Sequence, residues 1–343
     1  MGDMFKELRK KSVKSRKGIP IVNKDISFPD NVINDFVEID NVKLKRKRVS
    51  LNYESCKVRI CTMCPFPNDG TARKIDDKFL FEQLNNAGCR DDDYDILTIY
   101  HNGNFFADNE IRPDLRLKIY KYINELNIKH FVVETLPQNI NEEKLSVFKE
   151  NCPNIKLHVA IGVQTMDDFL RKYAILSHFD NSVLDNSINL LKKFNYVPRI
   201  FIMFGMPFLT IEESLYVTIN DIKIIKKRYN IEENVVICPL VIMPFTMAYD
   251  LNKSTPLNAP NVEDINNLIV LLSKNKLKPK ITINSSVYEY IGDNNKKEKY
   301  DAFKNNLIDF NNKGFCDIDN CNIENNNYKK ENIIEKINSY IKS

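Results

Sequence analysis

Three cysteines lie within nine residues of one another, at Cys56, Cys61 and Cys64, and a proline-rich turn follows them. Structural zinc normally takes four protein ligands. An iron–sulfur cubane held by three thiolates instead keeps one iron open for a ligand that is not protein. The nearest histidine, His101, is far along the chain, and polar residues interleaved with the cysteines argue against simple burial. The spacing therefore favours an iron–sulfur cluster; a zinc site and a buried thiol trio remain as alternatives.

The remaining cysteines form no evident second site. The chain has eight cysteines in all, without the even spread of a secreted disulfide protein, so we expect reduced thiols. Cys316 and Cys321 form a Cys-x4-Cys pair, which could hold a second metal only if Cys89 or Cys152 joined them. We expect Cys238, on a predicted strand, to serve packing.

Length and composition describe a globular protein. The 343 residues are 43% apolar, and the longest apolar stretches fall short of a membrane span, so we expect a cytoplasmic protein without a membrane partner. Net charge is only +4, but residues 1–17 hold seven Lys or Arg, and "KLKRKR" occupies 43–48. Such segments can bind nucleic-acid phosphates, although a solvated tail beside an exposed strand explains them equally well.

After residue 47, apolar β-branched runs alternate with amphipathic ones, which is typical of βα units around a parallel sheet. Three glycines end predicted strands, where barrel active sites are built, and no GxGxxG follows the first strand, which disfavours a dinucleotide-binding sheet. These glycines are Gly103, Gly162 and Gly205. The predicted strands are 48–53, 95–101, 130–135, 156–162, 199–205 and 235–243, and the predicted helices are 76–86, 112–126, 141–150, 166–174, 181–194, 210–229 and 262–275.

We predict three regions: a basic N-terminal extension (1–47), a partial (β/α)6 TIM-like barrel (48–290), and a small helical C-terminal appendix (291–343). The appendix is rich in Asn and Lys. Its apolar positions repeat at helical spacing, as two short docked helices would show.

Several motifs occur in order along the predicted strand ends: "CTMCPFPNDG", "YHNGNFFADNEI", "VVETLP", "VAIGVQTMDDFLRKYAI" and "FGMPFLTIEESL". Together with the cysteine loop they resemble the radical S-adenosylmethionine (SAM) superfamily, and within it the elongator catalytic-subunit group and the archaeosine-type enzymes. The resemblance covers about residues 48–250. The cysteine spacing is one residue longer than the usual Cys-x3-Cys-x2-Cys. Leu136 and Gln138 replace an Arg and an Asp of the elongator group, and no acetyltransferase domain follows.

The resemblance implies a radical SAM enzyme in which the three cysteines hold a [4Fe-4S] cluster. The cluster cleaves SAM to a 5′-deoxyadenosyl radical, which abstracts hydrogen from the substrate. It also implies an electron donor such as ferredoxin or flavodoxin, and a modified tRNA base or its lysine adduct as substrate. A small metabolite or peptide is an alternative substrate. A zinc-stabilised, noncatalytic nucleic-acid-binding protein is an alternative function.

The resemblance also assigns residues to the cofactor. Met63 would lie against the adenine, a turn at a strand end would bind the methionine amine, and two polar side chains would reach the amine or the ribose. The turn is Asn102, Gly103 and Asn104, and the two side chains are Glu134 and Gln164. Glu134 could instead cap a helix, and Gln164 could instead satisfy loop backbone groups.

Substrate contacts are predicted from aromatic, histidine and methionine residues near late strand ends. Methionine more often fills a core, and a lone histidine is more often structural. The candidates are Tyr53, His101, His178, Met206, Met243 and Tyr249, with Met203 and Met247 beside them.

Overall fold

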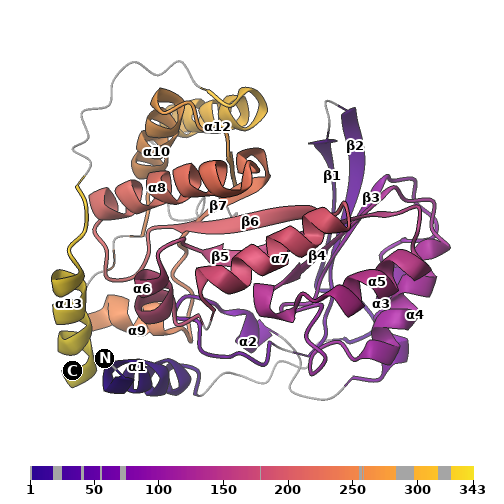
Figure 1. The fold of residues 1–343 in the computed structure, drawn as a ribbon, viewed down its shortest axis with the longest axis horizontal. Helices are drawn as coiled ribbons and strands as arrows, with labels where there is room; N and C mark the ends of the chain where they lie inside the picture. The colour runs from indigo at the N-terminus through magenta and orange to yellow at the C-terminus, as the bar shows by residue number, and fades with distance from the viewer. Residues whose placement is uncertain are drawn as a thin grey trace.

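The centre of the molecule is a sheet whose strands follow one another in chain order, with eight strands among the residues described. The structure is a computed structural model that describes residues 2–17, 25–39, 42–54, 56–69, 75–177, 179–254, 257, 259–282, 297–315 and 326–343. The first two strands form an antiparallel hairpin, and every later pair is parallel. The sheet curls into a half-barrel (Figure 1). The strands are β1 (Asn31–Ile39), β2 (Val42–Ser50), β3 (Ile96–Tyr100), β4 (His130–Thr135), β5 (Lys156–Gln164), β6 (Val197–Phe204), β7 (Val235–Pro239) and β8 (Lys280–Ile281).

Helices connect the parallel strands and cover one face of the sheet. They are α2 (Phe66–Asp69), α3 (Asp77–Asn86), α4 (Pro113–Asn124), α5 (Glu142–Asn151), α6 (Asp168–Leu170), α7 (Asn181–Lys193), α8 (Ile211–Tyr229), α9 (Met247–Ser254) and α10 (Val262–Lys274). Short turns lie at Pro137–Asn139, Arg171–Ile175 (a π-helical turn, η2) and Glu232–Asn234. Outside this unit are α1 (Gly2–Ser15), α12 (Lys297–Lys313) and α13 (Lys330–Lys342).

The strand pleat divides the side chains between two faces. Leu97 and Ile99 of β3 belong to the main hydrophobic core beneath the helices. Thr98 and Tyr100, the alternate residues, lie on the opposite face, which we call the concave face. Successive residues of a strand point to opposite sides of a sheet, so one short strand serves both an apolar core and a polar interior.

The predicted α/β half-barrel is confirmed. Parallel strands β2 to β7 form its six-stranded part, and residues 130–135 are a strand with the predicted ends. The first strand lies earlier than expected, at 42–50 instead of 48–53, because the basic run pairs with β1. Asparagines and two acids interrupt the apolar residues of β1, so a search for apolar runs does not reveal this hairpin.

Both predicted C-terminal helices are present. Phe303 and Phe310 of α12 are fully buried, while Ile308 is 47% exposed. The first of these helices packs on α10 and β8, and α13 packs on α1. The proposed region boundaries at 47/48 and 290/291 stay predictions.

The basic N-terminal segment begins with a helix that docks on the rest of the protein. Leu8 of α1 is fully buried, and α1 contacts α9 and α13. Lys11 donates a hydrogen bond from Nζ to the Tyr340 carbonyl at 2.9 Å. Figure 1 shows α1, α9 and α13 together at one end of the molecule, with the two chain ends side by side.

The charges of the "KRKR" run, residues 45–48, are paired within the fold. Lys45 binds Asp93 at 2.6 Å. Buried Lys47 binds Asp92 and donates to the Ala87 carbonyl at 2.5 Å. These contacts fix β2 against the connection that leads into β3.

The other two residues of the run pair with the neighbouring strand. Arg46 and Arg48 both bind Asp35 of β1. Neutralising the whole run would therefore disturb the fold, and it is not a clean test of nucleic-acid binding.

None of the helices in the described residues is long and apolar enough to cross a membrane.

Lys47→Ala is expected to lower the free energy of unfolding by about 2 kcal/mol, because the buried Ala87 carbonyl loses its partner and the alkyl stem leaves a void. Chemical denaturation measures this change. Lys43→Ala, at an exposed position on the same strand, should change stability by less than about 0.5 kcal/mol. Equal effects from the two substitutions would contradict the assigned role of Lys47.

Candidate metal and cofactor site

The cysteine segment 56–64 follows β2 and lies at the rim where the carboxyl ends of the parallel strands meet. It contains no helix or strand. Its backbone groups therefore lack the partners that regular structure would supply, and other segments must supply them.

Helix α1 provides the first set of partners. Arg16 donates from Nε to the Arg59 carbonyl at 3.0 Å and from its two terminal nitrogens to the carbonyls of Cys61 at 2.7 Å and Cys64 at 2.9 Å. Ser12, one turn earlier, donates to the Ile60 carbonyl at 2.8 Å. One guanidinium fork thus fixes the spacing of two of the three cysteines.

Thr62, between these cysteines, joins the loop to two other segments. Its hydroxyl donates to the Ala174 carbonyl at 2.7 Å, and its N–H donates to the Ile175 carbonyl at 3.1 Å. Its own carbonyl accepts from the Ala248 N–H of α9 at 2.9 Å. The loop is therefore tied to the turn η2 after β5 and to α9.

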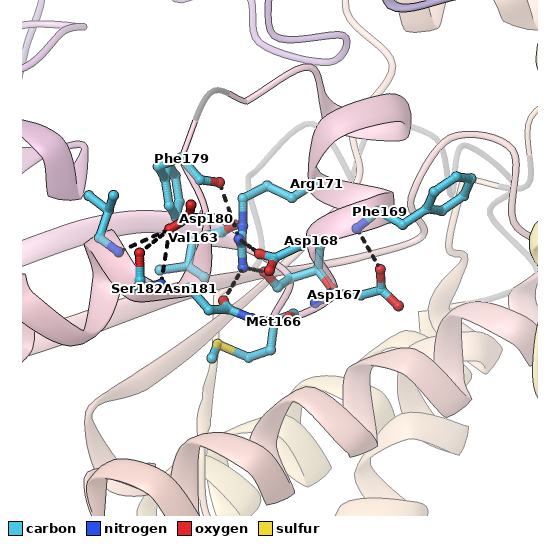
Figure 2. A network of polar contacts seen from close by, with 12 residues as sticks. Val163, Met166, Asp167, Asp168, Phe169, Arg171, Phe179, Asp180, Asn181 and Ser182 are labelled. Carbon is cyan, nitrogen blue, oxygen red and sulfur yellow. Dashed lines mark hydrogen bonds and ion pairs between the residues drawn. The ribbon is translucent and has the colours of Figure 1, made fainter. Parts of the chain in front are cut away.

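Arg171 in turn anchors η2, as Figure 2 shows. Its side chain is fully buried and makes an ion pair with Asp168 at 2.5 Å. It also donates to Asn181 Oδ1 at 2.8 Å and to the carbonyls of Val163 and Thr165. Because several acceptors surround one buried cation, Arg171 fixes the path from β5 through η2 to the cysteine loop.

The segment after β3 holds the other side of the loop. Asn104 donates from Nδ2 to Glu110 Oε1 at 3.0 Å, and the same amide lies 3.8 Å from Cys56 Sγ. Glu110 also accepts from the backbone N–H groups of Asn104 at 2.5 Å and Lys57 at 3.1 Å. The Asn104 carbonyl oxygen Oδ1 accepts from the Leu136 N–H at 2.8 Å. This one asparagine therefore connects the cysteine loop with the end of β4.

Gly103 is required by the close approach of these groups. A Cβ at this position would lie 2.1 Å from Glu110 Oε2 and 3.0 Å from His101 Nε2. Burial opposes ionisation of Glu110, but His101 and hydrogen bonds from Asn104 outweigh it and lower the pKa of this carboxyl. A buried carboxylate thus stands beside the predicted cofactor turn.

Two residues predicted to bind the cofactor have an uncommon backbone conformation. Asn102 has φ 58° and Gln164 has φ 68°, and the β5–β6 register shifts between Gly162 and Gln164. Left-handed non-glycine residues carry strain and concentrate at ligand sites. Both follow or end strands at the rim that carries the cysteines.

Glu134 lies on the concave face near the end of β4. Its carboxyl makes no hydrogen bond within the described part of the chain, and burial together with Glu110 raises its pKa to about 8. A half-buried acid without a partner is suited to accept bonds from a bound amine or hydroxyl.

The three thiols affect one another. Burial raises the pKa of Cys64, and neighbouring Cys61 and Cys56 raise it further, while Arg16 opposes the rise. Burial also raises the pKa of Cys56, to about 12. Crowded thiols that resist ionisation gain most from a metal, because coordination deprotonates a thiol outright. The donor set thus fits a thiophilic cation.

Across the described ranges, no three His, Cys, Asp or Glu side chains are arranged so that they could hold a metal ion as they stand. The cysteines would have to turn toward a common centre. Rotation about χ1 moves a thiol without moving the backbone atoms that hold the loop.

The predicted cofactor residues occupy neighbouring strand ends. Asn104 contacts the cysteine loop directly, as described above. Met63 packs against a cluster of buried residues that includes Met203, Met206 and Tyr173. Gln164 turns back over Gly162. Their contacts with SAM stay predictions.

The predicted substrate residues are dispersed. Tyr53 lies in the main core, His101 is buried beside Glu110, and Met206 is buried in the cluster near Met63. Half-buried Met243 accepts a hydrogen bond at its carbonyl, and Tyr249 lines an outer cavity next to α1.

Three further predictions fall on residues that the structure does not describe. His178, Cys316 and Cys321 lie outside the described residues. Cys89 and Cys152, considered as their partners, are buried in the main core.

Sequence reasoning missed Arg16, Glu110 and Arg171. Arg16 looks like one of many charges in a basic segment, and Glu110 looks like one acid in a polar loop. Only Arg171 carried a signal, since it and Lys172 interrupt the otherwise apolar segment "FLRKYAI".

No protein-family model matches the chain. The sequence is 26% identical over 230 residues to an uncharacterized protein of Methanocaldococcus jannaschii, covering 64% of this chain and 61% of that one. It is 23% identical over 183 residues to an archaeosine synthase subunit beta of Methanosarcina acetivorans, covering 52% and 53%. The match therefore spans about half to three fifths of these relatives' length.

Among solved structures, methylornithine synthase aligns with a TM-score of 0.45 at 13% identity, covering 78% of this chain and 67% of that one. A radical SAM methyltransferase, TsrM, from Kitasatospora setae, with cobalamin and a [4Fe-4S] cluster bound, aligns with a TM-score of 0.41 at 13% identity, covering 60% and 35%.

Arg16→Ala is expected to raise the rate of amide hydrogen exchange in residues 56–64 by about tenfold or more, because three charge-assisted hydrogen bonds to the loop are lost. Exchange followed by peptide mass spectrometry measures this. Lys17→Ala, an exposed cation just after α1, should leave the exchange rate unchanged. Unaltered exchange in Arg16→Ala would show that this arginine does not hold the loop.

Stability is expected to fall as pH rises from about 5 to 8, because Glu134, Asp221 and Asp264 have raised pKa values in the folded protein. Burial lowers the pKa of His158 to about 3, which opposes this fall below about pH 6.5. Burial raises the pKa of Glu134 to about 8 and that of Asp221 to about 7. The stability that these protonated carboxyls contribute is fully present below the pKa of the unfolded chain. It is lost as pH rises through their pKa values in the folded protein.

Glu134 and Asp221 should each contribute a slope of about 1.4 kcal/mol per pH unit between their unfolded and folded pKa values. Denaturant unfolding at several pH values measures the slope, and the double variant Glu134→Gln, Asp221→Asn should flatten it. An equally steep slope in the double variant would refute the assignment.

Proposed function

We propose that this protein is a radical SAM enzyme whose Cys56, Cys61 and Cys64 bind a [4Fe-4S] cluster with one open iron. The observation that carries the proposal is the position of the cysteine loop. It lies at the carboxyl-end rim of a half-barrel, tied by Arg16 and Thr62 and adjoining the turn at Asn104. When bound, the cluster would supply the electron for reductive cleavage of SAM.

The chain's own residues have definite tasks in this proposal. The three thiols would hold the cluster, and Arg16 keeps the carbonyls of two of them in place. Asn104 and Glu134, from adjacent strand ends, would bind the amine of the cofactor. The positive charge of a bound ammonium would favour the ionised form of the Glu134 carboxyl. Packing of Met63 into an apolar cluster would exclude water from the reacting carbon.

For the substrate we propose a modified tRNA base carrying a lysine adduct. The similarity to archaeosine synthase subunit beta supports this choice. So does a cavity of about 580 Å³ between α1, α9 and α13, lined by Lys11, Lys14, Lys17 and Lys253. Lysines at such a surface neutralise phosphates without reading sequence.

Anaerobic reconstitution with iron and sulfide, followed by dithionite and SAM, tests the chemistry. The wild type should form 5′-deoxyadenosine, measured by mass spectrometry, and Cys64→Ala should form none. Cys152→Ala, which removes a thiol from the main core, should retain the activity. A protein that binds one zinc, takes up no cluster and does not cleave SAM would support the noncatalytic alternative instead.

The substrate is tested separately, by tRNA binding. The variant Lys14→Ala, Lys17→Ala should bind tRNA at least several-fold more weakly, with a smaller dependence on salt. Equal tRNA affinity in this variant and the wild type would favour a small metabolite or peptide substrate.

A further inference from the structure

The concave face of the half-barrel carries arginines on two well-separated strands. On β2, Arg48 pairs in register with Thr98 of β3. On β6, Arg199 pairs with Ala160 of β5, and Ala160 pairs with Glu134 of β4. Since paired residues of neighbouring strands lie on the same face, both arginines face the interior of the half-barrel.

These arginines outnumber the acids that could neutralise them. Arg46 and Asp35 form a two-point pair at 2.8 and 2.7 Å. Arg48 must share the same carboxylate, at 3.0 Å. Arg199 has no ion pair with any residue in the described part of the chain. Three guanidinium groups therefore share the concave face with two carboxyls, and only that of Asp35 forms ion pairs with them among the described residues.

Polar atoms beside this cluster lack hydrogen-bond partners. Arg48 Nε and Thr98 Oγ1 are buried, and neither has a partner within the described residues. An unsatisfied buried donor costs about 1–3 kcal/mol. Burial lowers the pKa of Arg199, and nearby Arg46 and Arg48 lower it further, against partial compensation from Tyr100 and Asp35. The arginines and unpartnered polar atoms of this region therefore lower the stability of the folded protein when no ligand is bound.

Two other buried cations among the described residues, Lys47 and Arg171, have several acceptors, whereas buried Arg116 of α4 keeps an unpartnered Nη1. Lys47 is 1% exposed and binds both a carboxylate and a carbonyl. Arg171 is fully buried and has carboxylate, amide and carbonyl acceptors. Lys47 and Arg171 are therefore held by acceptors from the fold itself, whereas Arg199 on the concave face has no ion pair with any described residue.

We propose that Arg48 and Arg199, with the Thr98 hydroxyl, bind an anionic group of a ligand inside the half-barrel, either a phosphate or a carboxylate. Both groups offer several oxygens to the planar guanidinium fork. Arg199 shares a row of the sheet with Glu134, and Arg48 lies one step toward the amino ends of the strands. The anionic group would therefore lie deeper in the half-barrel than the cysteine rim.

The identification of this ligand as the substrate rests on the proposed function. A substrate held by its anionic end at Arg48 and Arg199 would direct its other end toward the rim. The substrate class is then a molecule with a phosphate or carboxylate separated from the reacting carbon by a short spacer.

The test follows thermal unfolding of the full chain in millimolar inorganic phosphate, with chloride used to keep the ionic strength constant. The wild type should show a saturable rise of several degrees in Tm. General stabilisation by phosphate as an excluded salt would not saturate. An acetate series in place of phosphate distinguishes a carboxylate site from a phosphate site.

Arg199→Gln should abolish the saturable rise, and Arg48→Gln should weaken it at least tenfold in apparent Kd. The matched control is Arg90→Gln, which removes an exposed arginine paired with Glu125 and should keep the full response. Without added anion, Arg199→Gln should unfold at the same or a higher temperature than the wild type, because it removes a buried charge that lacks a counter-ion.

Two results would overturn the inference. One is the absence of a saturable response to both phosphate and acetate in the wild type. The other is an undiminished response in Arg199→Gln. A lower Tm of Arg199→Gln without anion would show that Arg199 is a structural group. None of these measurements needs the cluster. A failed test of the radical chemistry would therefore leave the anion-binding result valid, and a failed anion-binding test would leave the radical chemistry untouched.

Discussion

The hydrogen bonds from Arg16 to the carbonyls of the cysteine loop are the interaction on which the proposed site depends. Residues 56–64 form no helix or strand, and the hydrogen bond within the loop from the Cys64 N–H to the Cys61 carbonyl, at 3.3 Å, does not fix the loop against the rest of the protein. The guanidinium of Arg16 reaches the carbonyls of Cys61 and Cys64 together. Because this arginine lies at the end of α1, and α1 packs on α9 and α13, the geometry of the thiols is coupled to both ends of the chain.

The alternation of side chains across the sheet organises the rest of the molecule. One face of each parallel strand is buried under helices, while the other carries Arg46, Arg48, Tyr100, Glu134 and Arg199. Burying these groups lowers stability unless they meet partners. The polar groups of the concave face therefore lower the stability of the fold. This face lies directly below the rim that carries the cysteines.

Much of the fold was predictable from the sequence, and less of the site. Residues 130–135 have the apolar residues Phe131, Val132 and Val133 at their centre, and the strand has the predicted ends. Strand β1 was missed because asparagines and two acids interrupt its apolar residues, and its pairing is with the basic strand β2. Asn104 was found from its place after a strand, whereas Glu110 and Arg16 were not, because their roles depend on contacts between segments 6 to 48 residues apart.

The central claim is that the three cysteines hold a cluster with one iron open to SAM. Electron paramagnetic resonance of the reconstituted, reduced protein tests it most directly. We predict the signal of one reduced [4Fe-4S] cluster per chain whose g values change when SAM is added, and no such signal in Cys61→Ala. A cluster signal that SAM leaves unchanged, or iron binding that persists in Cys61→Ala, would contradict the account.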